Sequence, residues 1–144
     1  MKVEVKIDKT IKEPYVLIYT NQMNEHIKNI VNIIDDKPMA IAATLNEKTF
    51  ILKPENIFLI QVNEGMLDIY DINKTYRLNE RLYEIKKRLN AEFIQISKGS
   101  IINMRYVESV EASFSGSLKV HLKNGLSDYI SRSYTKTFKA YLGI

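Results

Sequence analysis

Side chains that donate hydrogen bonds gather in the C-terminal third of this chain, between stretches that alternate apolar and polar residues. They are Lys98, Ser100, Arg105, Arg132 and Ser133. Alternation with a period of two predicts β-strands, so these donors would lie on loops at strand ends. Donors on rigid β loops, with no acid pair or activated nucleophile beside them, favour binding of an anionic polymer over a reaction.

Residues that usually perform catalysis or bind metals show no useful grouping. The chain has no cysteine, which excludes thiolate metal sites and thiol nucleophiles. His26 and His121 stand apart, and neither has a partner at the spacing of metal ligands. The glycines are scattered and form no phosphate-binding loop. We therefore predict that the protein is not an enzyme and uses no metal or cofactor.

The positive charge lies close to the loop donors. The whole chain has a net charge of +4. Residues 1–37 carry six basic and six acidic side chains, whereas residues 91–144 carry seven basic and four acidic ones, a net charge of +3. A basic patch indicates nucleic acid, although an ordinary solvated surface can carry the same excess.

The length of 144 residues and the hydrophobic content of 45% predict one domain with a small appendage. The opening residues alternate charged and apolar side chains and do not resemble a signal peptide. No apolar stretch has the length that a bilayer requires. These features predict a cytoplasmic protein.

Residues 1–37 are predicted to form a strand–strand–helix extension, with strands over residues 2–7 and 15–20. Helical spacing then places one set of apolar side chains on a single face. This set is Met23, Ile27, Ile30, Val31 and Ile34. Thr20 or Asn21 is expected to cap the helix, and the segment from Asp35 to Pro38 is expected to end it.

Residues 38–144 are predicted to form a second unit that is mainly β, with helices over residues 79–89 and 134–142. Strands are expected over residues 41–45, 49–52, 56–62, 67–72, 75–78, 93–96, 106–111, 117–122 and 126–131. Asn124-Gly125 is typical of a type I′ hairpin turn. The first of these helices carries a basic run, but Glu84 lies one turn before Lys87 and Arg88, which favours a solvated face.

Three stretches of this second unit resemble the LytTR DNA-binding domain of bacterial response regulators. The first covers residues 54–61 and leads to Glu64-Gly65-Met66, and the second covers residues 93–107. The third is Asn124-Gly125 followed by residues 130–134. Over its full length the chain is similar to stand-alone LytTR regulators, which have a short N-terminal extension in place of a receiver domain.

The resemblance implies an elongated stack of small antiparallel sheets with short helices, whose loops enter successive major grooves of double-stranded DNA. It places Lys98, Arg132 and Met66, the last beside Glu64 and Gly65, at base-contacting positions. Contacts with the DNA backbone are expected from Ser100, Arg105, Ser131, Ser133, Tyr134 and Lys136. Met66 stands where the family often has a polar residue, so it could contact only a thymine methyl group. Gly99 stands where serine is common, which removes one hydroxyl group beside Lys98.

The sequence therefore predicts a sequence-specific transcriptional regulator. Its partner would be double-stranded DNA. The apolar face of residues 1–37 would be covered by the body of this chain, by a second copy or by another protein. The resemblance also implies a small membrane protein that restrains the regulator. The alternative is a protein-interaction module that docks a partner through the N-terminal helix and has no role on DNA.

Overall fold

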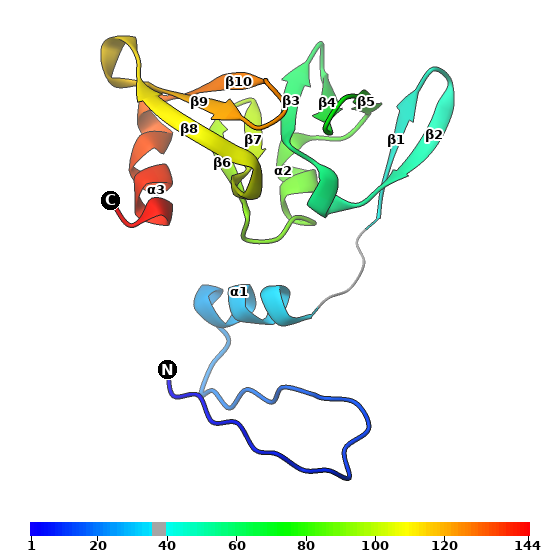
Figure 1. Cartoon of the computed structure of the whole chain (residues 1–144), viewed down its shortest axis with the longest axis vertical. Helices are drawn as coiled ribbons and strands as arrows, with labels where there is room; N and C mark the ends of the chain where they lie inside the picture. Colours follow the sequence, from blue (N-terminus) through cyan, green and yellow to red (C-terminus); the bar gives the residue numbers. More distant parts are fainter. Residues whose placement is uncertain (36–39) are drawn as a thin grey trace. The chain divides into compact units, whose positions relative to one another are not determined.

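The computed structural model describes residues 1–35 and 40–144. The chain divides into two compact units, Met1–Asp35 and Asp36–Ile144 (Figure 1). Pro38, expected to stop the first helix, and the expected boundary between residues 37 and 38 lie outside the described residues.

The N-terminal unit contains one helix, α1 (Glu25–Ile34). Asn24 caps it, because its side-chain oxygen accepts a hydrogen bond from the Ile27 amide at 2.9 Å. The predicted caps Thr20 and Asn21 were therefore wrong by three or four positions. Residues 2–7 and 15–20 adopt no strand in the described structure, contrary to the prediction. Alternation suits a strand, but a strand also needs a neighbouring backbone to receive its hydrogen bonds.

Within residues 40–144, the second unit contains ten strands in two antiparallel sheets. The larger sheet has the strand order β2-β1-β5-β4-β3-β7-β6, and the smaller has the order β10-β9-β8 (Figure 1). The strands of the larger sheet are β1 (Ile41–Leu45), β2 (Lys48–Leu52), β3 (Leu59–Asn63), β4 (Met66–Tyr70), β5 (Thr75–Leu78), β6 (Phe93–Ser97) and β7 (Ser100–Asn103). Those of the smaller sheet are β8 (Val107–Ala112), β9 (Leu118–Leu122) and β10 (Ser127–Ile130). The predicted mainly β class is confirmed.

Short helical elements connect the strands. These are η1 (Pro54–Asn56), α2 (Leu82–Lys86), η2 (Met104–Tyr106), η3 (Phe114–Gly116) and α3 (Arg132–Leu142). Helix α2 is shorter than predicted and begins after Arg81 rather than after Asn79. Helix α3 begins two residues earlier than predicted, which places Arg132 in its first turn.

Strand β7 was missed by the sequence analysis. All four of its residues are buried, because it lies between β3 and β6 with side chains packed on both faces. Such a strand has no polar face, so its sequence lacks the alternation that identified the other strands.

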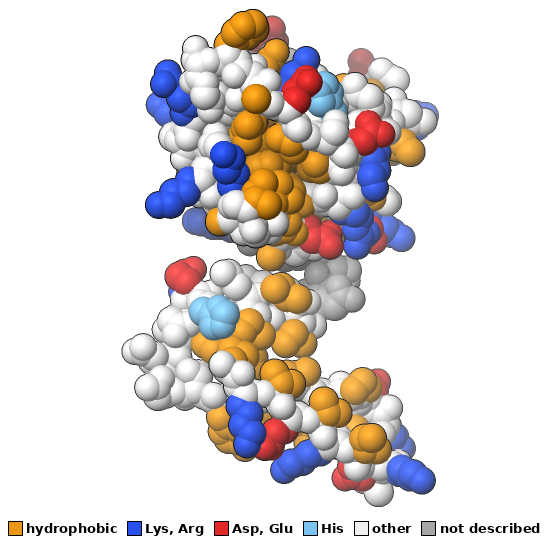
Figure 2. Space-filling model, turned by 60° about the vertical axis from the view of Figure 1, so that its left-hand side comes forward, with side chains coloured by type: hydrophobic (Ala, Val, Ile, Leu, Met, Phe, Trp, Pro, Cys, Tyr) orange, Lys and Arg blue, Asp and Glu red, His pale blue; other side chains and the backbone are white. Residues whose placement is uncertain are grey.

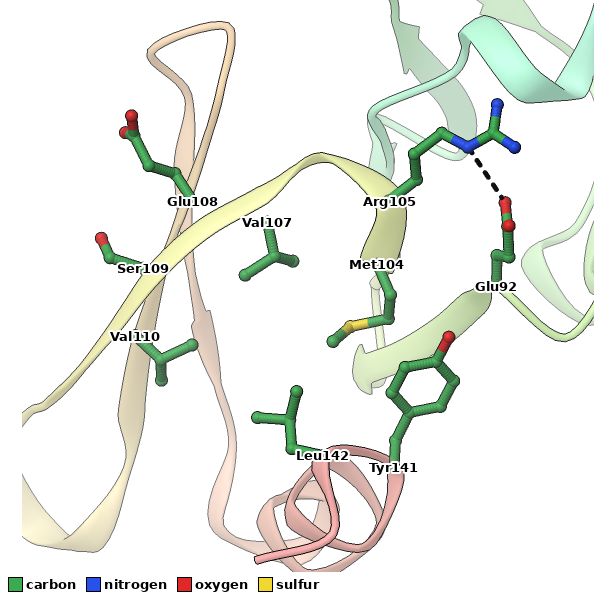
Figure 3. Close-up of a pocket in the computed structure, with 9 residues that line it drawn as sticks. All are labelled: Glu92, Met104, Arg105, Val107, Glu108, Ser109, Val110, Tyr141 and Leu142. Atoms are coloured by element: carbon green, nitrogen blue, oxygen red, sulfur yellow. Dashed lines mark ion pairs between the residues drawn. The ribbon is translucent and has the colours of Figure 1, made fainter.

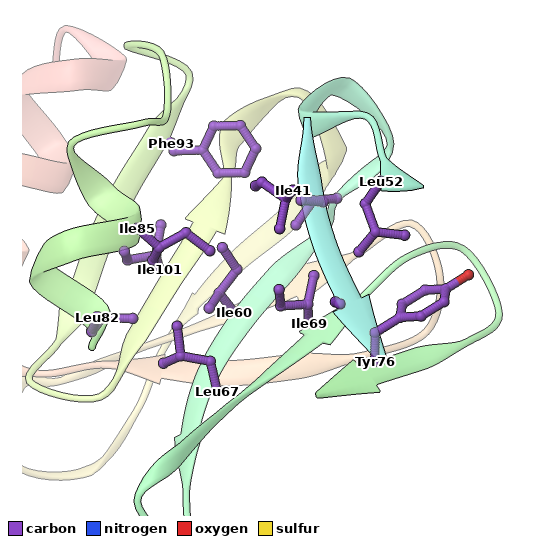
Figure 4. Packing of buried hydrophobic residues seen from close by; sticks show 12 residues of the cluster. Ile41, Leu52, Ile60, Leu67, Ile69, Tyr76, Leu82, Ile85, Phe93 and Ile101 are labelled. Atoms are coloured by element: carbon purple, nitrogen blue, oxygen red, sulfur yellow. The ribbon is translucent and has the colours of Figure 1, made fainter. Parts of the chain in front are cut away.

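Two clusters of buried side chains lie on opposite faces of the larger sheet. Neighbouring residues of β7 show this directly, because Ile101 belongs to one cluster and Ile102 to the other. The first cluster includes Leu82 and Ile85 of α2 (Figure 4). The second joins the smaller sheet and α3, and Phe138 anchors α3 with 1% of its surface exposed.

Candidate nucleic-acid interface

The turn between β6 and β7 holds Lys98 in a fixed place. Ser97 Oγ accepts a hydrogen bond from the Gly99 amide at 3.2 Å. The Gly99 carbonyl accepts a hydrogen bond from the Val62 amide of β3 at 2.8 Å. The turn is therefore tied to the neighbouring strand, and the Lys98 side chain projects from it into solvent.

The start of α3 is fixed in a similar way. The Ser131 amide donates a hydrogen bond to the Ile96 carbonyl of β6 at 2.9 Å. The Ser131 carbonyl accepts from the Tyr134 amide at 2.9 Å and from Thr135 Oγ1 at 3.2 Å. Hydrogen bonds of Ser131 and Tyr134 therefore hold the backbone before and after Arg132. Its side chain is exposed.

These contacts bring Lys98 and the start of α3 to one edge of the unit. Lys98 lies two residues beyond Ile96, the residue that holds Ser131 in place. The β3–β4 turn with Met66 lies at the same edge, because Gly99 also contacts Val62 just before that turn. Figure 1 shows the β3–β4 turn and the β8–β9 loop along this upper edge. We call this set of loops the reading edge.

Hydrogen bonds hold the β3–β4 turn in shape. Glu64 and Gly65 both have positive φ angles, of 51° and 75°, as tight hairpin turns require. Arg77 Nη2 donates to the Asn63 carbonyl at 2.9 Å, and Asn63 Nδ2 donates to Asp68 Oδ2 at 2.8 Å. Met66 is half-buried at the end of this turn.

Four of the residues predicted to contact the DNA backbone lie in or next to the first turns of α3. Ser131 and Tyr134 are half-buried, whereas Ser133 and Lys136 are exposed. Tyr134 Oη lies 3.5 Å from Gln95 Nε2 of β6. The group therefore adjoins Arg132 on a helix whose start is fixed against the larger sheet.

The two other predicted backbone contacts differ from this group. Ser100 adjoins the Lys98 turn, but only 6% of its surface is exposed. Arg105 lies in η2, beyond the opposite end of β7 from the reading edge, and forms an ion pair with Glu92 at 3.5 Å (Figure 3). The structure therefore does not bring Arg105 together with Lys98 and Arg132.

Arg105 lines a cavity of about 470 Å³ between η2, β8 and the end of α3. Its walls include Met104, Val107 and Leu142, which point into the same space in Figure 3. The only acidic groups among its lining residues are Glu92, which is paired with Arg105, and Glu108. This cavity contains no pair of groups arranged for acid–base catalysis.

The cations of the reading edge differ in their pairing from some, but not all, of the other cations in this unit. Within residues 1–35 and 40–144, Lys98, Arg132 and Lys136 form no ion pair. Arg88, by contrast, binds Glu80 at 2.9 Å, and Lys86 Nζ contacts Gln95 Oε1 at 3.3 Å. Lys86 and Arg88 are thus engaged with neighbouring side chains. Lys98, Arg132 and Lys136 present unpaired positive charge, as do Arg81 and Lys123 within residues 40–144.

The sequence analysis missed Phe114 in the β8–β9 loop. Its side chain is 91% exposed, although phenylalanine is usually buried. Gly116, two residues later, lies so close to Arg132 that an added Cβ would be 3.3 Å from Arg132 Cδ. The sequence offered one signal for an exposed Phe114, because this aromatic residue stands between Ser113 and Ser115 in a loop that joins two strands.

Histidines and acids form no metal site in the part of the chain that the structure describes. His121 Nε2 lies 2.9 Å from Glu111 Oε1, and this contact holds the pKa of Glu111 below its usual value. Nowhere in residues 1–35 and 40–144 is there a helix with the length and apolar character that a membrane crossing requires.

Comparison with known proteins identifies the family. Residues 47–143 match the model of the LytTr DNA-binding domain. The chain belongs to the LytTR family. It is a DNA-binding transcriptional regulator, as predicted, and the interaction-module alternative is not favoured.

Relatives match the LytTR chain along its whole length. Uncharacterized HTH-type transcriptional regulators from Staphylococcus aureus strains N315 and MSSA476 are each 30% identical to it, over 100% of this chain and 99% of theirs. The fold is also that of the LytTr DNA-binding domain of a Bacillus cereus protein described as a methyl-accepting/DNA response regulator. That match has a TM-score of 0.69 and 15% identity, and covers 73% of this chain and 97% of the other.

The LytTR unit presents no helix-turn-helix in its described residues. Helices α2 and α3 are separated by five strands, from β6 to β10, rather than by a short turn.

Proposed function

We propose that this regulator recognises duplex DNA through the reading edge, with Lys98 and Arg132 donating to bases in the major groove. The proposal is supported by two properties that Lys98 and Arg132 share at one edge of the unit. The backbones that bear Lys98 and Arg132 are fixed by hydrogen bonds, while their charged ends form no ion pair within the described chain. A fixed backbone with an open charged end can be aimed at a base.

The chemistry of the two side chains suits guanine. Arginine can donate two parallel hydrogen bonds to guanine O6 and N7, and lysine can donate to the same atoms. Each such contact typically gives about 1–3 kcal/mol of discrimination. Met66 and Phe114 offer apolar surface at the same edge, which suits the methyl group of thymine.

Residues at the start of α3 would fix the register on the DNA backbone. Ser131, Ser133, Tyr134 and Lys136 supply hydroxyl groups and one charge next to Arg132. Such contacts orient a protein on DNA without reading its sequence. Arg105 is not part of this proposal because η2 lies away from the reading edge, and Ser100 contributes little because only 6% of its surface is exposed.

We also propose that the protein works in the cytoplasm, where bacterial DNA is found. A second copy of the chain and a small membrane protein are the two candidate partners of the N-terminal unit. Both would use the apolar side chains that this unit exposes.

Salt-dependent binding tests the role of the phosphate contacts. A DNA target is first selected from a random duplex pool with the purified full chain. Replacing Lys136 with alanine should weaken binding to the selected and scrambled duplexes alike and reduce the salt slope by about one. The matched control is Lys123→Ala, which removes an equal charge in the β9–β10 turn, away from the reading edge. An equal effect of both variants would contradict a localised interface.

A further inference from the structure

Residues 2–8 form an extended segment that has apolar residues on one side and charged residues on the other. Val3, Val5 and Ile7 lie on one side and are 80%, 85% and 90% exposed. Charged residues alternate with them, and the ion pair of Lys2 Nζ with Glu4 Oε1 at 2.9 Å shows that these two lie on a common side. Figure 2 shows hydrophobic and charged side chains interspersed on the open surface of this unit.

This exposure is unusual for a folded chain. Among the apolar side chains of the described N-terminal unit, Ile27 alone is buried, with 8% of its surface exposed. A unit that buries so little apolar surface needs a further surface to cover it. The extended segment also presents backbone groups without a strand partner, which makes it a template for pairing with another strand.

The sequence of this segment is complementary to itself in the antiparallel direction. With Val5 opposite Val5 of a second copy, Lys2 faces Asp8, Val3 faces Ile7 and Glu4 faces Lys6. Every charged residue then faces an opposite charge, and every apolar residue faces an apolar one. Opposite charges directly across a strand pair stabilise it, whereas like charges destabilise it.

Other arrangements lose this match. A shift of two residues in one direction places Lys2 opposite Lys6 and Glu4 opposite Glu4. The opposite shift places Glu4 opposite Asp8 and Lys6 opposite Lys6. A parallel pairing in register places each charge opposite its like. Pairing with residues 15–20 of the same chain offers no charged partner, because that stretch has no charged residue.

We propose that residues 2–8 pair with the same residues of a second copy, antiparallel and about a twofold axis at Val5. Such an interface uses the same surface on both copies and closes after two. The six aliphatic side chains on its apolar side form a strip that amphipathic α1 helices can cover. Because it concerns the N-terminal unit alone, the pairing does not depend on how the reading edge contacts DNA.

Cysteine cross-linking tests the register, and the chain suits it because it has no cysteine of its own. Directly opposed residues of antiparallel strands have Cα atoms about 4.5–5.5 Å apart, within the disulfide range. Full-length Val5→Cys should form a disulfide dimer under mild oxidation. Val3→Cys alone should not, because its two copies would lie about 13 Å apart.

When Val3→Cys chains are mixed with Ile7→Cys chains, the two variants should form disulfides with each other. The control is Glu13→Cys, which is exposed outside the pairing segment and should remain monomeric on a denaturing gel. Equal cross-linking of Val5→Cys and Glu13→Cys would overturn the proposal, as would efficient dimer formation by Val3→Cys alone.

Charge reversal tests the same pairing in solution. Glu4→Lys converts both Glu4–Lys6 contacts into Lys–Lys contacts and should weaken the dimer about tenfold in sedimentation equilibrium. The double variant with Glu4→Lys and Lys6→Glu restores opposite charges and should recover the original affinity. Glu13→Lys makes the same change of charge outside the segment and should leave the dimer intact. Circular dichroism of each variant checks folding.

A monomeric wild-type chain, or a double variant as weak as Glu4→Lys, would overturn the pairing. If another protein covers residues 2–8 instead, the purified chain alone should be a monomer in sedimentation equilibrium. If such a monomer still lost specific DNA binding on mutation of Arg132, the proposed function would stand and the pairing alone would fail.

Discussion

Some lysine and arginine side chains in this protein are held by acidic partners, and others, at the reading edge and elsewhere, are not. Arg88 and Arg105 are held by acidic partners, whereas Lys98, Arg132 and Lys136 have none in the described residues. The sequence identified Lys98 and Arg132 as loop donors. It could not separate them from Arg105, because the distance of η2 from the reading edge and the pairing with Glu92 depend on tertiary structure.

Burial likewise separates two serines that the sequence analysis treated alike. Ser133→Ala removes an exposed hydroxyl beside Arg132 and should weaken binding to selected and scrambled DNA by a similar, few-fold factor. Ser100→Ala changes a residue with only 6% of its surface exposed and should leave both affinities nearly unchanged. Titration of the two variants against both duplexes checks this, and weaker binding by Ser100→Ala would show that its hydroxyl reaches DNA.

Two loops of the second unit, one at the reading edge and one away from it, contain glycines in backbone conformations that few other residues tolerate. Gly116 has φ of +78° and contacts the aliphatic part of Arg132, while Gly125 has φ of +88° and has nothing within 4 Å of an added Cβ. Asn124-Gly125 was predicted as a turn from its residue types alone. The contact of Gly116 with Arg132 joins segments distant in the sequence, so no local pattern revealed it.

These two glycines form a matched pair for mutation. Gly116→Ala and Gly125→Ala should each lower the free energy of unfolding by about 1–2 kcal/mol, because both force alanine into a left-handed conformation. Gly116→Ala alone should also reduce specific DNA binding, since its methyl group displaces Arg132. Urea denaturation and DNA titration measure the two effects. Equal losses of DNA affinity would contradict the proposed contact.

Strand prediction succeeded or failed according to where each strand is buried. Residues 41–45, with one face covered, were predicted with the bounds that β1 has. β7 is buried on both faces and was missed. Residues 2–7 show clear alternation but form no strand in the single chain. The proposed pairing with a second copy would supply the partner that this alternation lacks.

At the scale of the whole molecule, the two units differ in how they are stabilised. Both hydrophobic clusters consist only of residues from Ile41 onward, so the second unit has a complete interior of its own. The N-terminal unit exposes most of its apolar side chains. Its contribution to function would therefore come through assembly rather than through the stability of the DNA-binding unit.

A truncated chain of residues 40–144 should fold as a monomer with a cooperative urea transition. It should retain specific binding to a single DNA site, because every residue of the reading edge is present. It should lose the gain in affinity that a paired chain obtains on DNA with two adjacent sites. Titrations with one-site and two-site duplexes measure this. An unfolded truncated chain would contradict the independence of the second unit.

The central claim is that Arg132 reads bases, and paired titrations of Arg132→Ala test it most directly. Wild type, Arg132→Ala and the control Lys123→Ala are titrated against the selected duplex and a scrambled duplex, with folding checked by circular dichroism. We expect Arg132→Ala to weaken binding to the selected site by about 1–3 kcal/mol, or roughly 5-fold to 150-fold, while its affinity for scrambled DNA hardly changes. An equal loss on both duplexes would show that Arg132 contacts only phosphate, and the base-reading role would be wrong.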